Sequence, residues 1–219
     1  MNEYYPVMLQ LQGEKITVVG GGAVAERKIK SLLDAGADNL FLISPQLTTR
    51  LQEWAKAGAF HYIERGYSAA DIQDARLVFA ATNDSELNKR IAEEARQAGA
   101  WVNVVDDSSF GNMVNPSVVR RGDLLIAVSA SGASPALSIR IKQELEQQYG
   151  LEYTDSVKRL RELRELILVT IEDKREREAL LRMAAAEVPL YEEGDKDIEA
   201  WLTRLRKLMT GGIHNGIIK

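Results

Sequence analysis

Gly20, Gly22 and Ala25 form the first pattern in the sequence that could serve a reaction. The spacing Gly-x-Gly-x-x-Ala is typical of dinucleotide binding: the first glycine permits a tight turn, the second lets the backbone approach a pyrophosphate, and the small third residue lets a helix pack closely on a strand. A plain turn between a strand and a helix is the alternative explanation. The candidate ligand residues at this turn are Gly20, Gly22, Ala23 and Val24.

The segments on either side of this turn favour the nucleotide site. Residues 16–19 are an uninterrupted β-branched run, which is typical of a strand buried on both faces of a parallel sheet. Apolar residues recur at helical spacing over residues 25–36, so the turn leads directly into an amphipathic helix. The positive N-terminal end of that helix would face the phosphates.

Asp106 and Asp107 are the residues at a predicted strand end that are best suited to proton transfer. A carboxylate with a pKa of about 3.9 is ionised at neutral pH and can accept a proton without much tuning. Asp106 directly follows a predicted buried strand, so we expect it to face the crevice where ligands bind; a role in a turn or a helix cap is the alternative. The two histidines, His61 and His214, fall in an early strand and in the tail, where we expect surface or packing roles.

The composition limits the class of protein. The chain has 219 residues, 45% hydrophobic and 27% charged, and we expect two domains. A net charge of −4 argues against nucleic acid as the main partner. The lack of cysteine excludes disulfides, Cys-ligated zinc and thiol catalysis, and we assign no metal ligands. No targeting pattern and no run of roughly 18 apolar residues is found, so we expect a cytoplasmic protein without a membrane partner.

Strand and helix patterns alternate over about the first 130 residues. Such alternation implies right-handed crossovers and a parallel sheet with helices on both faces. The predicted fold class is therefore α/β, with a Rossmann-like, doubly wound parallel sheet over residues 1–133 as the dinucleotide-binding domain. The predicted strands cover residues 16–19, 40–43, 60–63, 77–81, 101–105 and 124–129.

The pattern changes after residue 133. Ser134-Pro135 is typical of a helix start, with a capping residue followed by proline at the first helical position, and Thr154 is predicted to cap the next helix. No convincing strand follows, so residues 134–219 are predicted to form an all-helical C-terminal region. Its helices could pack alone or against a second subunit. The predicted helices cover about residues 134–149, 154–167, 173–187 and 198–208.

Ligands of an open α/β sheet bind beyond the carboxyl ends of the strands. The position about 20 residues after the glycines, which in many NAD sites is an acid that bonds the ribose 2′-hydroxyl, is Ser44. No arginine directly follows Ser44 to hold a 2′-phosphate, the nearest being Arg50, so we predict NAD rather than NADP. The residues expected to line the cofactor site beyond the glycine turn are Ser44, Pro45, Gln46, Thr82 and Asn83.

Polar and basic residues near the last two predicted strands are candidates for substrate binding. Arginines hold carboxylates in bidentate pairs, although scattered surface cations are the ordinary alternative. The candidates are Asn103, Ser129, Ser131, Ser134, Arg120 and Arg121. Further cations that could face the crevice are Arg27, Lys28, Arg140 and Lys142.

Five segments, in order along the chain, together resemble the precorrin-2 dehydrogenase family, which includes the N-terminal module of siroheme synthase. They span roughly residues 1–150, and a helical remainder is also expected for this family. Five ordered matches are far more specific than the glycine pattern alone. The segments are Tyr5-Pro-Val-Met-Leu-Gln-Leu, Val18-Val-Gly-Gly-Gly-Ala-Val-Ala-Glu-Arg-Lys28, Ala80-Ala-Thr-Asn83, Asn103-Val-Val-Asp106 and Ser129-Ala-Ser-Gly-Ala-Ser-Pro135.

The resemblance implies an activity. Members of the family oxidise precorrin-2 to sirohydrochlorin with NAD, on the way to siroheme and, in some organisms, cobalamin. They are homodimers whose helical parts help form the interface, and the tetrapyrrole binds in a cleft between the parts. Asp106 matches the family's catalytic aspartate, which would remove the proton that accompanies hydride transfer. Residues 134–219 would then serve dimerisation and substrate binding.

One departure from the family pattern concerns metal insertion, because some members also insert ferrous iron. The bifunctional members have Ser-Ser-Gly-Gly-Thr-Ser-Pro where this chain has alanine at positions 130 and 133 of the segment 129–135. The loss of two hydroxyls predicts weak metal insertion or a separate chelatase as partner; a bifunctional dehydrogenase and ferrochelatase is the alternative. The chain ends at Lys219, too early for the methyltransferase that the large siroheme synthases append.

Two other classes use a similar glycine turn. One is a methyltransferase that binds S-adenosylmethionine. The other is a non-enzymatic nucleotide-sensing regulatory domain, as in potassium-uptake gating subunits, which would not need Asp106. Both would favour an acid near Ser44, and the helical C-terminal third disfavours both.

Overall fold

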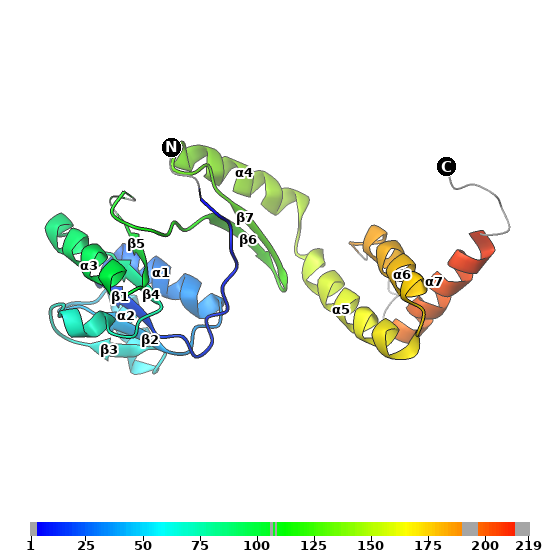
Figure 1. Ribbon diagram of the computed structural model, residues 1–219, viewed down its shortest axis with the longest axis horizontal. Coiled ribbons are helices and arrows are strands. Elements are labelled where there is room, and N and C mark those ends of the chain that lie inside the picture. Colours follow the sequence, from blue (N-terminus) through cyan, green and yellow to red (C-terminus); the bar gives the residue numbers. More distant parts are fainter. Residues whose placement is uncertain (1–3, 106, 108, 190–196, 213–219) are drawn as a thin grey trace. The chain divides into compact units, whose positions relative to one another are not determined.

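The chain folds, in a computed structural model, as two compact units that divide between Asn115 and Pro116. The structure describes residues 4–105, 107, 109–189 and 197–212. Over those residues, the first unit holds a five-stranded sheet with helices, and the second holds a two-stranded sheet and four helices (Figure 1). The strands of the first unit are β1 (Ile16–Val19), β2 (Leu40–Ile43), β3 (His61–Ile63), β4 (Leu77–Ala80) and β5 (Trp101–Val104). Its helices are α1 (Ala23–Asp34), α2 (Thr49–Lys56), the 3-10 helix η1 (Ala69–Ile72) and α3 (Ser85–Gln97).

The five strands are parallel and lie in the order β3-β2-β1-β4-β5. The chain steps outward from β1 to β3 and then returns to β4 on the other side of β1. Val19, the last residue of β1, pairs with Ala80, the last residue of β4, so the two strands end side by side. This reversal of strand order is the place where α/β sheets bind their ligands. The predicted Rossmann-like class is confirmed.

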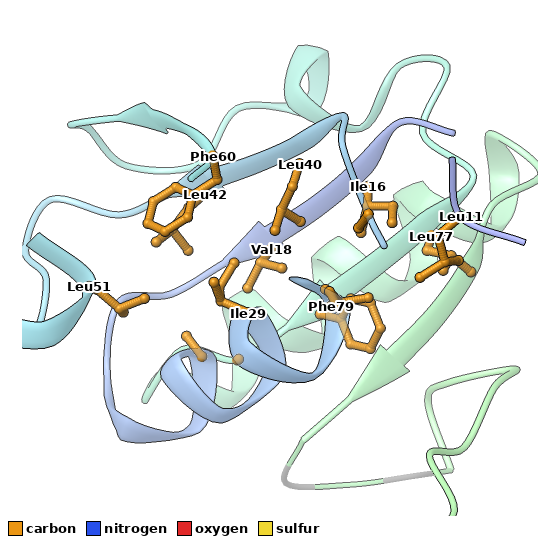
Figure 2. Close-up of a cluster of buried hydrophobic side chains, with 14 residues drawn as sticks. Leu11, Ile16, Val18, Ile29, Leu40, Leu42, Leu51, Phe60, Leu77 and Phe79 are labelled. Carbon is orange, nitrogen blue, oxygen red and sulfur yellow. The ribbon is translucent and has the colours of Figure 1, made fainter. Parts of the chain in front are cut away.

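Helices cover both faces of the sheet, which explains the uninterrupted apolar strands. Ile16 and Val18 of β1 pack against α1 and α2, in the cluster drawn in Figure 2 with Ile29, Leu40 and Phe79. On the opposite face, Val19 packs in a second cluster that includes residues of α3 and η1. The four strand residues 16–19 are therefore all buried.

The second unit begins with a hairpin of β6 (Ser117–Arg121) and β7 (Leu124–Val128). Helix α4 (Pro135–Gln148) packs on β6, and the Arg121 guanidinium joins the two by donating to the carbonyl oxygens of Tyr149 (2.8 Å) and Glu146 (3.1 Å). Ser134 caps α4, as predicted, by accepting from the backbone N–H of Leu137. Arg121 thus satisfies carbonyls that a helix leaves unpaired at its C-terminal end.

Three further helices form the hydrophobic core of the second unit. They are α5 (Glu152–Thr170), α6 (Lys174–Ala186) and α7 (Ile198–Gly212). Their buried residues include Leu163, Leu180 and Trp201. The Glu187 carboxylate accepts hydrogen bonds from the Trp201 indole (2.7 Å) and the Arg204 guanidinium, so it ties the end of α6 to α7. Within the described ranges, no helix has both the length and the apolar character to cross a membrane.

Two predictions about local structure are wrong. Residues 124–129 were expected to form a sixth parallel strand, but β7 pairs antiparallel with β6, a strand that the sequence analysis missed. Gly122 and Asp123 alone connect the two strands, and a two-residue link can make a hairpin but not a parallel crossover. Thr154 was expected to cap a helix, but α5 begins at Glu152 with Leu151 as its N-cap. The division of the two units at 115/116 also precedes the boundary expected after residue 133.

Candidate functional site

The glycine turn between β1 and α1 has no room for side chains at its first two positions. Gly20 has a positive φ of 116°, and a Cβ there would overlap the carbonyl oxygen of Ala81, which follows β4. A Cβ at Gly21 would overlap the carbonyl oxygen of Gln46, in the loop after β2. The turn therefore packs directly on the two neighbouring strand ends. The Gly-x-Gly pattern did not mark Gly21, because Gly21 occupies its variable position.

Gly22 differs from its two neighbours because it faces open space. It is the N-cap of α1 with an ordinary φ of −86°, and a Cβ built there would meet nothing within 4 Å. No side chain caps the helix. The first N–H groups of a helix have no partner inside the helix and carry its positive dipole end. This end of α1 can therefore hold an anion such as a pyrophosphate.

The loop after β2 packs against the glycine turn. The backbone N–H of Thr48 donates to the carbonyl oxygen of Gly21 (3.0 Å), and the Thr48 hydroxyl donates to the Glu26 carboxylate of α1 (2.7 Å). Ser44 is only 6% exposed, and its hydroxyl donates to the carbonyl oxygen of Gln46 (2.7 Å). The structure thus brings Ser44 and Gln46 to the glycine turn, but it uses the Ser44 hydroxyl to shape the loop.

The loop after β4 is held by Asn88 of α3, which the sequence analysis missed. The Asn88 side-chain amide donates to the carbonyl oxygen of Thr82 (3.0 Å), and its oxygen accepts from the hydroxyl (2.7 Å) and backbone N–H (3.1 Å) of Thr82. Asp84 caps α3. Thr82 is fixed beside the glycine turn, while Asn83 is exposed. No sequence motif marks Asn88, because its burial and its bonds to the preceding loop arise only in the fold.

A pocket of about 530 Å³ lies between the loop after β2, helix α2 and the edge strand β3. Its volume is in the range of ligand sites. Residues that line it include Pro45, Gln46, Gln52, Lys56, Tyr62 and Glu64. Pro45 and Gln46 were predicted to contact the cofactor from sequence, whereas Glu64 was not singled out.

Two cations of the first unit, Lys28 and Arg50, lie over aromatic rings. Lys28 is half-buried, with its ammonium 5.6 Å from the centre of the Phe79 ring. Burial, and to a lesser extent the charge of Arg27, lower the pKa of Lys28 to about 8. Arg50 lies over the Trp54 ring at 5.0 Å and is part of α2.

The segment after β5 contains the residue predicted to carry the chemistry. Asp106 lies outside the described residues. Asp107 is exposed and accepts a hydrogen bond from the backbone N–H of Ser109 (2.8 Å), and hydrogen bonds from Ser109 lower the pKa of its carboxyl. Asn103 is buried and donates to the carbonyl oxygen of Met113 (3.1 Å), so its amide holds the chain that returns past β5.

The other substrate candidates lie in the second unit. Ser129 accepts from the backbone N–H of Ser131 (3.1 Å), and Ser131 has a positive φ of 50°, so the two form a tight turn before α4. Ser134 is the cap of α4, Arg120 is exposed, and Arg121 is held by carbonyls of α4. Among the residues that the structure describes, no group of three or more His, Asp or Glu side chains could hold a metal ion.

Comparisons with known proteins agree with this geometry. Residues 7–117 match the family model described as "Putative NAD(P)-binding". The solved structure titled SirC, precorrin-2 dehydrogenase, superimposes with a TM-score of 0.77 at 31% identity, over 93% of this chain and 100% of that one. A precorrin-2 dehydrogenase of Methanosarcina barkeri is 35% identical over 187 residues, 82% of each chain.

Longer relatives share the same region. A siroheme synthase of Nitrosococcus oceani is 40% identical over 152 residues, which are 68% of this chain and 32% of that protein. Another, of Ectopseudomonas mendocina, is 42% identical over 144 residues. The chain therefore spans about a third of the length of the siroheme synthases that it matches.

Proposed function

Because this chain belongs to the precorrin-2 dehydrogenase family, we propose that it oxidises precorrin-2 to sirohydrochlorin with NAD, in the biosynthesis of siroheme. The observation that carries the proposal is the open face of Gly22 at the N-terminus of α1, at the point where the strand order reverses. A dinucleotide needs both a close backbone approach and a positive helix end, and this turn offers both.

The proposed reaction needs residues that bind the cofactor and a residue that accepts a proton. Bound NAD would accept a hydride from the macrocycle, and a base must take the proton that leaves with it. Asp106 is the base in this proposal, because a carboxylate is ionised at neutral pH. The backbone of Gly20, Gly22, Ala23 and Val24 holds the phosphates. The loops that carry Ser44, Pro45, Gln46, Thr82 and Asn83 position the rest of the cofactor.

The residues that we propose for substrate binding are those named from the sequence. Precorrin-2 is a tetrapyrrole with several carboxylates, so cations and hydroxyls should bind it. We assign this role to Asn103, Ser129, Ser131, Ser134, Arg120 and Arg121, with Arg120 as the most accessible guanidinium of the pair. We further propose a cytoplasmic homodimer in which residues 134–219 contribute to the interface.

Metal insertion is the second candidate activity, because some members of the family are bifunctional. Ser129 and Ser131 remain, but Ala130 and Ala133 lack the hydroxyls of the bifunctional pattern. We expect ferrous or cobaltous ion added to sirohydrochlorin and this protein to enter the macrocycle at close to the uncatalysed rate, as followed by the shift in absorbance. An increase of roughly tenfold or more over that rate would contradict this expectation and favour the bifunctional function.

The test of the main proposal is an oxygen-free reaction of the purified protein with precorrin-2 and NAD. We expect nicotinamide reduction at 340 nm together with the absorbance of sirohydrochlorin. A nucleotide-sensing regulatory domain would instead bind NAD and leave it unreduced.

A further inference from the structure

We propose that Glu64, at the carboxyl end of β3, selects NAD over NADP: its carboxylate accepts a hydrogen bond from the adenosine ribose 2′-hydroxyl and repels a 2′-phosphate. The inference rests on the proposed function, because it needs a dinucleotide at the glycine turn. It assigns a specificity role to a residue that the dinucleotide pattern does not mark, since that pattern places the acid at the end of β2.

Ser44, at the expected position, cannot perform this selection as the structure has it. Its side chain is nearly buried, its hydroxyl donates to the carbonyl oxygen of Gln46, and its carbonyl oxygen accepts from the Tyr62 hydroxyl (3.1 Å). A serine hydroxyl has a single proton to donate. It also carries no charge with which to exclude a phosphate.

Glu64 directly follows β3, the strand next to β2, at the same edge of the sheet. The backbone N–H of Ser44 donates to the carbonyl oxygen of Ile63 (3.2 Å), which places Glu64 directly beyond the neighbouring strand end. Adjacent strands are about 4.8 Å apart, a span that a glutamate side chain can cover. Glu64 is exposed and lines the 530 Å³ pocket together with Pro45 and Gln46, the residues predicted to contact the cofactor.

The charges around Glu64 favour a free ribose over a phosphate. Arg65, the next residue, is held by both oxygens of the Asp71 carboxylate (2.6 and 2.8 Å), so its charge is already matched. Lys56 lines the same pocket. It ends α2, so it stands roughly 10 Å along the helix axis from the loop beside the glycine turn, where that helix begins. Burial and the negative charge of Glu64 both raise the pKa of Tyr62, whose hydroxyl donates to the carbonyl oxygen of Ser44 in the loop after β2 (3.1 Å).

The test compares Glu64→Gln with Glu53→Gln. Glu53 is an exposed residue of α2 that does not line the pocket, so its substitution removes the same charge from the same region. Dissociation constants for NAD and NADP are measured by calorimetry without precorrin-2. We expect wild type and Glu53→Gln to prefer NAD, and Glu64→Gln to reduce the ratio of the two constants by about tenfold, with part of the change as tighter NADP binding.

The outcomes distinguish the role of Glu64 from the proposed function. An unchanged ratio in Glu64→Gln, in a protein that binds NAD, overturns the role of Glu64 and leaves the proposed function intact. A wild-type protein that prefers NADP, and loses that preference in Lys56→Gln, also overturns it and makes Lys56 the selecting residue. A wild-type protein that binds neither nucleotide contradicts both the proposed function and this inference.

Discussion

Replacing Asp106 by Asn is expected to lower turnover of precorrin-2 by about 10²–10⁴-fold while the affinity for NAD stays within about twofold of wild type. The amide keeps the size of the carboxylate but cannot accept a full proton at neutral pH. The loss should therefore appear in kcat and not in cofactor binding. Turnover is measured by nicotinamide reduction without oxygen, and NAD affinity by calorimetry.

The neighbouring Asp107→Asn variant is the matched control. Asp107 is exposed, and its carboxylate accepts a hydrogen bond from the backbone N–H of Ser109, so it has a local structural role in the loop. We expect its replacement to change kcat by less than about threefold. Wild-type turnover in Asp106→Asn would remove Asp106 from the mechanism, and a large loss in Asp107→Asn alone would transfer the role to that residue.

Alanine at Gly22 should greatly weaken nucleotide binding without unfolding the protein. The added methyl group meets no atom of the protein and the backbone φ is ordinary, so the free energy of unfolding should change little. The same methyl group occupies the space that a pyrophosphate needs to approach the helix end. We expect the affinity for NAD to fall by roughly 100-fold, about 2.7 kcal/mol, while the midpoint of thermal unfolding is kept.

Gly20→Ala provides the contrast. Its methyl group would overlap the carbonyl oxygen of Ala81, and its positive φ alone costs an L-residue about 1–3 kcal/mol. That variant should lose thermal stability as well as NAD binding. A Gly22→Ala protein that binds NAD normally would show that the cofactor does not lie at the start of α1.

The order of elements in the first unit could be predicted because each element has a recognisable local sequence pattern. A β-branched run and an apolar run, each of four residues, predicted β1 and β2 at their observed bounds, and in the second unit Ser134 marked the start of α4. These patterns arise from burial on both faces and from unpaired N–H groups, which act over a few residues. The TM-score with a structure of the same family confirms the result.

The hairpin could not be predicted in the same way. The run 124–128 has the composition of a buried strand, and only its pairing distinguishes a sixth parallel strand from half of a hairpin. Pairing is a long-range property, although the two-residue link at Gly122 was a local sign. Thr154 failed as a cap because only three residues separate α4 from α5, which begins at a position without a capping side chain.

The site was predictable where backbone geometry defines it, and less so where side chains compete for partners. Gly20 and Gly22 have the steric roles that their pattern implies. Ser44 stands at the predicted position, but its hydroxyl is used within the loop, and Asn88 fixes Thr82 from a helix position that no motif marks. Hydrogen bonds that form only once the loops are folded decide which polar groups remain available to a ligand.

The most direct measurement of the central claim is the stoichiometry of the oxygen-free reaction of precorrin-2 with NAD. Removal of two electrons as a hydride, with one accompanying proton, requires one NADH for each sirohydrochlorin formed. We expect this one-to-one ratio in wild type. Both products should form roughly 100-fold or more slowly in Asp106→Asn, and much more slowly in Gly22→Ala at an NAD concentration near the wild-type dissociation constant. Sirohydrochlorin formed without NADH, or NAD left unreduced in the presence of precorrin-2 and wild-type protein, would contradict the proposed function.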